Sequence, residues 1–131
     1  MAQRILVVED DEFLRELYEE LLKGEGYDVT VAVDGDEGLT QMAAGGFELV
    51  LLDIMLPKMD GLEILRHMKD KPAKQANGPV VLLTNLGQDS IIKEGFALGA
   101  SGYLIKSAMN PDQVLSEVKV FLNKSNLSSP S

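Results

Sequence analysis

Acidic side chains follow directly after two apolar segments of this chain, where they could take part in chemistry. Glu9-Asp10-Asp11 follows the apolar residues 5–8, and Asp53 follows the apolar residues 49–52. A carboxylate at the end of a buried strand is costly to desolvate, so it needs a compensating partner. The segment after Asp53 holds a Pro and an Asp-Gly turn signal, which indicates a sharp turn. Asp53 beside an ordered loop therefore suggests chemistry more than architecture.

Two further polar side chains stand at corresponding places. Thr84 follows the apolar residues 80–83, and Lys106 follows 103–105. In an open parallel sheet, ligands bind outside the carboxyl ends of the strands, so these side chains would meet the acids there. Carboxylates gathered at one edge raise one another's pKa, and a hard cation removes that conflict. Oxygen ligands with no Cys or His beside them favour Mg²⁺ over Zn²⁺.

These groups together suit phosphoryl transfer. A carboxylate can accept a phosphoryl group as an acyl phosphate. A metal ion, a lysine and a hydroxyl can neutralise and align the oxygens of the group in transfer. The residue types therefore predict a phosphoryl-transfer site that contains Asp53, Lys106 and Thr84.

Alternating strand-like and helix-like segments must position these residues. Five short apolar segments predict strands, at residues 5–8, 29–33, 49–52, 80–83 and 103–105. Four of them are continuously apolar, which is typical of parallel strands buried on both faces, whereas 29–33 alternates as an edge strand does. Helical spacing of apolar residues predicts helices over about 13–22, 36–44, 62–68, 91–98 and 114–122. Strict alternation predicts a parallel sheet with right-handed crossovers.

The last predicted helix has a well-defined start and an indistinct end. Asn110 can cap it, Pro111 suits its first position, and Gln113 can complete a capping box. Residues 123–131 are rich in Ser and Asn. We therefore expect the domain to span residues 1–124, with 125–131 as a flexible tail or the stump of a linker.

Length and composition limit the possible classes. The 131 residues fit one domain, and a content of 45% hydrophobic and 25% charged residues is that of a globular chain. The 21 acidic residues against 12 basic ones give a formal charge of −9, which argues against direct binding of nucleic acid or of an anionic membrane. The absence of Cys excludes disulfides and thiolate metal sites, and no apolar run approaches transmembrane length.

Four segments in this order resemble the receiver domain of two-component response regulators, over about residues 4–122. They are Ile5-Leu6-Val7-Val8-Glu9-Asp10-Asp11, Asp53-Ile54-Met55-Leu56-Pro57-Lys58-Met59-Asp60-Gly61, Leu82-Leu83-Thr84 and Gly99-Ala100-Ser101-Gly102-Tyr103-Leu104-Ile105-Lys106. Each is weak alone, but four in order at predicted strand ends are specific. The resemblance implies an α/β, flavodoxin-like doubly wound parallel sheet of five strands, in the order 2-1-3-4-5, with five helices. The second strand then lies at an edge, so Asp34 at its end stays outside the site.

The resemblance assigns a metal site to the acids. Asp53 matches the phosphoacceptor and also a metal ligand. Asp10 matches the acid that binds Mg²⁺ directly, and Glu9 matches its water-mediated companion. The backbone carbonyl of Met55 matches a further ligand. Asp11 falls just outside this set, where a helix begins.

The resemblance also assigns a switch. Thr84 matches the hydroxyl that reaches the phosphoryl group, Tyr103 matches the switch aromatic, and Lys106 matches the lysine that pairs with the phosphoryl oxygens. After phosphorylation, Thr84 moves toward the acyl phosphate and Tyr103 turns inward. The face formed by the fourth helix, the fifth strand and the fifth helix then changes shape.

The implied reaction requires partners. A sensor histidine kinase or a histidine phosphotransfer protein donates the phosphoryl group. The switched face binds a downstream protein target or output domain, and a phosphorylation-dependent dimer stays open. The resemblance implies a cytoplasmic signalling domain that promotes its own phosphorylation and dephosphorylation, rather than an enzyme with a separate substrate.

Some positions depart from the family pattern. Ser107 stands where the family commonly has Pro, and Asn85 stands where a small residue is usual. Met55 and Leu86 occupy two variable positions near the acceptor, where apolar side chains could hinder an attacking water.

Two other classes stay open. One is a degenerate receiver, a binding module that never takes phosphate, against which the set Asp10, Asp53, Thr84 and Lys106 counts. The other is a Mg²⁺-dependent aspartyl-phosphate phosphatase. Such enzymes resemble Asp-x-Asp-x-Thr proteins, whereas the residue two after Asp53 is Met55 and not an acid.

Overall fold

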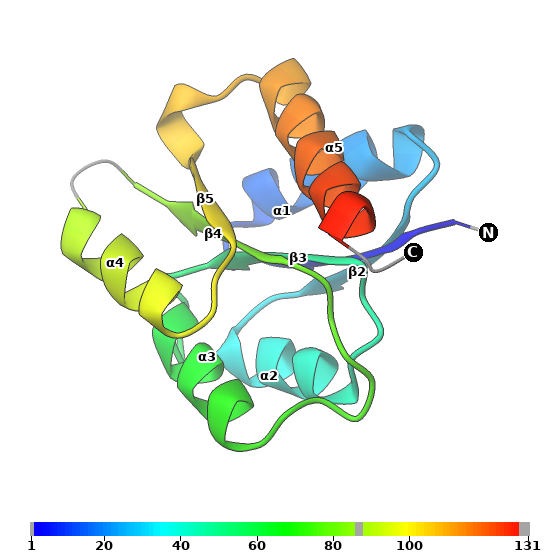
Figure 1. The fold of residues 1–131 in the computed structure, drawn as a ribbon. Helices are drawn as coiled ribbons and strands as arrows, with labels where there is room; N and C mark the ends of the chain where they lie inside the picture. Colours follow the sequence, from blue (N-terminus) through cyan, green and yellow to red (C-terminus); the bar gives the residue numbers. More distant parts are fainter. Residues whose placement is uncertain (1, 86–87, 129–131) are drawn as a thin grey trace.

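Five parallel strands form one sheet with helices on both faces (Figure 1). The computed structural model describes residues 2–85 and 88–128, with side chains as far as residue 123. Leu86, predicted to lie near the acceptor, is outside the described residues. The elements are β1 (Arg4–Val8), α1 (Glu12–Gly24), β2 (Asp28–Ala32), α2 (Gly35–Ala44), β3 (Leu49–Asp53), α3 (Gly61–Asp70), β4 (Val80–Thr84), α4 (Asp89–Ala97), β5 (Gly102–Ile105), a 3₁₀ turn (Lys106–Ala108) and α5 (Pro111–Ser128).

The strand order is β2-β1-β3-β4-β5, as predicted. β1 pairs with β2 on one side and with β3 on the other, and Ile5 lies opposite Val29 and Leu49. The neighbouring strands β1 and β3 are fully buried from Ile5 and Leu49 onward, whereas most of β2 is only half-buried at the edge. The doubly wound flavodoxin-like fold is confirmed.

Each face of the sheet has its own hydrophobic core, because successive side chains of a strand point to opposite faces. Ile5 and Val7 pack with α1 and α5, through Tyr18, Leu22 and Val118 among others. Leu6 and Val8 belong to the other core, which α2, α3 and α4 cover. Because helices cover both faces of the sheet, the acids at the strand ends extend from well-packed strands.

Aspartates at the ends of loops start three of the helices. The side chain of Asp11 accepts a hydrogen bond from the backbone N–H of Leu14 at 2.9 Å. Asp34 accepts one from Glu37 and Asp60 accepts one from Glu63, each at 2.9 Å. A carboxylate in this position satisfies a free N–H and favours the helix dipole. Asp11 and Asp34 therefore have a structural role, as the sequence indicated for Asp11.

The last helix begins as predicted and extends further than predicted. Asn110 Oδ1 accepts from the N–H of Gln113, whose Oε1 accepts from the N–H of Asn110, each at 2.9 Å. This is a reciprocal capping box. The backbone of α5 stays helical to Ser128, beyond residue 124, because Ser and Asn cost only tenths of a kcal/mol each in a helix. The domain boundary at 124 and the tail stay predictions.

An Asn110→Ala variant is expected to lose about 1 kcal/mol of folding free energy, since it removes one half of this capping box. The melting temperature should fall by about 3–5 °C for a domain of this size. Thermal unfolding followed by circular dichroism measures this shift. Asn110→Asp keeps the acceptor and should melt close to the unaltered protein, and an equal loss in both variants would contradict the cap.

Candidate functional site

A pocket lies at the carboxyl ends of β1, β3, β4 and β5. In Figure 1 these strands end at the same edge of the sheet. The pocket is lined by acids, one lysine and a few neighbours: Glu9, Asp10, Asp11, Leu14, Asp53, Met55, Asn85, Lys106 and Ser107. Parallel strands bring segments nearly 100 residues apart in the sequence to this one place.

Three carboxylates meet in this pocket. Glu9, Asp10 and Asp53 each offer an oxygen, and these oxygens lie within 4.8 Å of one another. The side chains of Glu9 and Asp53 are buried, whereas Asp10 is exposed at the mouth. A set of only oxygen ligands, part inside and part open to solvent, suits a hard divalent cation that keeps bound water.

Lys106 reaches between two of these acids. Its Nζ lies 2.7 Å from Glu9 Oε1 and 2.8 Å from Asp53 Oδ2. Asp53 Oδ1 accepts a hydrogen bond from the N–H of Met55 at 3.0 Å. Glu9 Oε2 accepts one from the N–H of Asp11 at 3.2 Å. One ammonium group therefore balances two buried carboxylates, which leaves the pocket short of positive charge.

Burial and crowding change the acidity of the pocket. Burial, followed by the hydrogen bond with Asp53, raises the pKa of Glu9 to about 7, although Lys106 acts in the opposite direction. Burial alone would lower the pKa of Lys106, but its contacts with Asp53 and Glu9 raise it overall. Lys106 is thus charged at neutral pH, and Glu9 takes up a proton close to that pH.

The metal-free protein should become less stable as pH rises from about 4.5 to 7. In this range Glu9 holds a proton in the folded state and not in the unfolded state, so raising the pH removes that advantage. The slope is at most about 1.4 kcal/mol per pH unit, and it should flatten above pH 7. Urea unfolding at several pH values in the presence of a chelator measures it. Glu9→Gln should remove this slope, and an unchanged slope would contradict the assignment.

Thr84 is buried at the end of β4, next to the pocket residue Asn85, and is not itself among the residues that line the pocket. Its side chain is 1% exposed, and its Oγ1 has no hydrogen-bond partner among the described residues. A buried hydroxyl without a partner costs about 1–3 kcal/mol, so its presence calls for an explanation.

Tyr103 lies outside the pocket. Its side chain is 44% exposed and meets the ring of Phe96 on α4 edge to face, with centroids 6.2 Å apart. Phe96 is itself exposed. The structure therefore shows the outward position of Tyr103, and the inward turn stays a prediction.

Arg15 is a contributor to the site that the sequence reasoning missed. Its Nη1 donates to the backbone carbonyls of Glu9 and Asp10, at 3.1 and 3.2 Å. It therefore fixes the loop that carries both acids. In the sequence, Arg15 is visible only as a basic residue among acids in the first half of α1. Its position in the sequence does not reveal that it binds the carbonyls of Glu9 and Asp10.

The departures from the family pattern are partly visible. Ser107 belongs to the 3₁₀ turn after β5 and lines the pocket. Asn85 also lines it, and its N–H donates to Gln88 Oε1 at 2.9 Å, which ties the start of the β4–α4 loop. Met55 also lines the pocket, and its side chain is 58% exposed.

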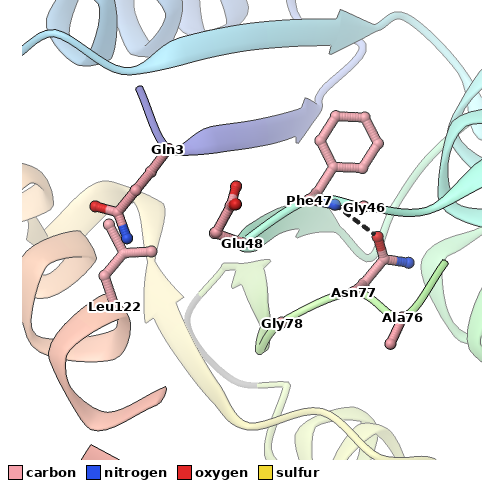
Figure 2. A pocket seen from close by; sticks show the side chains of 8 residues that line it. All are labelled: Gln3, Gly46, Phe47, Glu48, Ala76, Asn77, Gly78 and Leu122. Atoms are coloured by element: carbon pink, nitrogen blue, oxygen red, sulfur yellow. Dashed lines mark hydrogen bonds between the residues drawn. The ribbon is translucent and has the colours of Figure 1, made fainter. Parts of the chain in front are cut away.

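A second hollow lies at the amino ends of the strands, and its described lining carries a single ionisable side chain. Figure 2 shows its lining, with Asn77 accepting a hydrogen bond from the N–H of Phe47 at 3.2 Å. Asn77 also donates to the carbonyl of Met42 at 3.0 Å. Glu48 is the one ionisable side chain of the described lining. Its hydrogen bonds hold the loops together, and its described lining has no group of acids with a lysine like that at the opposite end of the sheet.

The family model of the response regulator receiver domain matches residues 5–119. The chain belongs to this family, and it is a receiver domain of two-component signalling, as the sequence predicted. Within the described residues, no helix is long and apolar enough to span a membrane.

Individual proteins with similar sequences or structures support this assignment to the family. The transcriptional regulatory protein DltR of Streptococcus agalactiae is 37% identical over 124 residues, which are 95% of this chain and 54% of DltR. ResD of Bacillus subtilis is 32% identical over 126 residues, which are 96% of this chain and 50% of ResD. The chain thus spans about half the length of these relatives. Among solved structures, a CheY-like receiver domain protein from Methanospirillum hungatei is 29% identical and superposes with a TM-score of 0.86. The superposition covers 98% of this chain and 100% of that protein's chain.

Proposed function

We propose that this receiver domain accepts a phosphoryl group on Asp53 with Mg²⁺ bound beside it. The observation that carries the proposal is the buried Asp53 carboxylate, paired with Lys106 at 2.8 Å and grouped with Glu9 and Asp10. Asp10, Asp53 and the carbonyl of Met55 would hold the ion, and Glu9 would act through water. Bound Mg²⁺ supplies positive charge for the oxygens of the transferred group.

The chain's own residues then align the transfer. An Asp53 oxygen attacks phosphorus, the new P–O bond forms, and the bond from phosphorus to the donor's imidazole nitrogen breaks. Lys106 already contacts Asp53 and can follow a phosphoryl oxygen as the group arrives. The N–H of Met55 holds the other carboxylate oxygen, so the carboxylate cannot rotate freely.

The partner-free hydroxyl of Thr84 supports a switch. A phosphoryl oxygen would give Thr84 Oγ1 the hydrogen bond that it lacks. Movement of Thr84 would free space for Tyr103, which lies two residues before Ile105, the β5 residue paired with Thr84. Tyr103 would leave its contact with Phe96 and thereby change the face made by α4, β5 and α5.

The family supports the proposed partners. A sensor histidine kinase or a histidine phosphotransfer protein donates the phosphoryl group. DltR and ResD are named transcriptional regulatory proteins, so an output on transcription through a downstream target or a linked domain is proposed. An isolated aspartyl-phosphate phosphatase is disfavoured, because Met55 stands at the position of that class's second acid.

Phosphorylation by acetyl phosphate tests the proposal. The protein should gain one phosphoryl group with Mg²⁺ and none in the presence of a chelator, as measured by intact mass. Borohydride reduction converts an aspartyl phosphate to homoserine, so peptide mapping should find homoserine at position 53. No labelling would favour the degenerate receiver, and labelling at another residue would overturn the role of Asp53.

A further inference from the structure

A tight contact holds the loop after β3 against the turn that begins α2. The loop comprises residues 54–60, and the turn contains Asp34 and Gly35. The N–H of Gly35 donates to the carbonyl of Pro57 at 3.2 Å. Outside this hydrogen bond, Lys58 Nζ lies 3.3 Å from Asp34 Oδ2. Two contacts of different kinds therefore join segments that are more than 20 residues apart.

Gly35 allows the close approach. A Cβ on this residue would lie 1.8 Å from the carbonyl oxygen of Met59 and 2.7 Å from its Cβ. The backbone of Gly35 is not in the left-handed region, so its conformation does not demand glycine. Alanine would even suit the first turn of a helix better. The loop backbone itself is what excludes a side chain here.

The loop residue that forms this ion pair has an uncommon backbone conformation. Lys58 has a φ of 67°, which non-glycine residues rarely adopt. The N–H of Glu37 and then Lys58 hold the pKa of Asp34 below its ordinary value, so Asp34 is charged at neutral pH. The ion pair thus holds the loop at Lys58, the loop residue with the uncommon φ.

The same loop is connected to the phosphoacceptor. The N–H of Met55 donates to Asp53 Oδ1, and Leu56 is buried in the core beneath α2 and α3. At its far end, the N–H of Gly61 donates to the carbonyl of Ile54 at 2.8 Å. A shift of the loop at Met59 would therefore move the Met55 peptide and its hold on Asp53.

We propose that the Asp34-Gly35 turn positions two backbone groups of Met55, the carbonyl for the metal and the N–H for Asp53. Gly35 is then a positioning residue. This inference rests on the proposed function, because Met55 is the proposed carbonyl ligand. The turn lies on the edge side of the sheet and offers no ligand itself. Its effect passes through the backbone of residues 55–59.

Gly35→Ala tests the inference, with Mg²⁺ alone as the probe. The variant should bind Mg²⁺ roughly 10- to 100-fold more weakly, the range seen when a residue that orients a ligand is changed. Isothermal titration calorimetry measures the affinity. In NMR spectra the Met55 amide resonance should move, while resonances of α1 and α5 stay in place. Gly24→Ala is the matched control, because a Cβ there has no neighbour within 4 Å.

The outcomes separate the inference from the proposed function. If the unaltered protein binds no Mg²⁺, the proposed metal site fails and this inference fails with it. If the unaltered protein binds Mg²⁺ and folded Gly35→Ala binds it equally well, only the inference is overturned. If Gly35→Ala does not fold, Lys58→Ala decides, because it removes an exposed group. It should weaken Mg²⁺ binding about two- to fivefold with a shifted Met55 amide, and unchanged values would overturn the inference.

Discussion

Asp53→Asn is expected to abolish phosphorylation by acetyl phosphate and Mg²⁺. An amide nitrogen or oxygen at this position does not form a stable acyl phosphate, whereas a carboxylate does. Asparagine has nearly the same shape, so the β3 strand end and the N–H contact from Met55 should persist. The lost charge also leaves Asp10 and Glu9 as the remaining carboxylates of the cluster. Intact mass after incubation should show no added phosphoryl group, and Mg²⁺ affinity should fall by at least about tenfold.

Asp11→Asn provides the matched control for that experiment. Asp11 lines the same pocket, but its side chain caps α1 through the N–H of Leu14. Asparagine caps a helix about as well as aspartate, so this variant should fold normally. It should be labelled close to the unaltered rate, since its carboxylate is occupied elsewhere. Undiminished labelling of Asp53→Asn would remove Asp53 from the proposed reaction.

The fold was predictable because its signals are local. Continuous apolar segments of this length are typical of strands buried on both faces, and alternation with amphipathic helices leaves few topologies. The gathering of Asp53, Thr84 and Lys106 followed from parallel pairing, which places strand ends at one edge. That argument needs no side-chain detail, so it located the pocket with its acids and lysine.

The remaining features depend on contacts that spacing does not encode. The approach of Gly35 to Met59 depends on how closely two loops meet, and the sequence shows only a common Asp-Gly pair. Arg15 binds carbonyls, which carry no sequence signature. The end of α5 was placed too early because weak helix formers can continue a helix that is already packed. Close contacts between loops, and between side chains and backbone carbonyls, therefore account for most of the features that were not predicted from the sequence.

Lys106→Ala is expected to lower the free energy of unfolding by about 3–5 kcal/mol at pH 8 without metal. Removing one partner of a buried ion pair leaves uncompensated charge, and here two carboxylates lose the same ammonium group. The loss should be smaller at pH 6, because Glu9 can then hold a proton. Urea unfolding at both pH values measures this difference. Lys119→Ala, which breaks an exposed pair with Glu25, should cost less than about 1 kcal/mol at either pH.

The same variant should separate metal binding from switching. Lys106 contributes no ligand to the proposed metal site, so Mg²⁺ should bind Lys106→Ala with an affinity close to that of the unaltered protein. Added Mg²⁺ should therefore stabilise both proteins by a similar amount, since it binds the folded state of each. Beryllofluoride should shift the NMR resonances of Tyr103 and α4 in the unaltered protein and not in the variant, because the phosphoryl mimic lacks its lysine. A large loss of Mg²⁺ affinity in Lys106→Ala would contradict this division, since it would make the lysine part of the metal site.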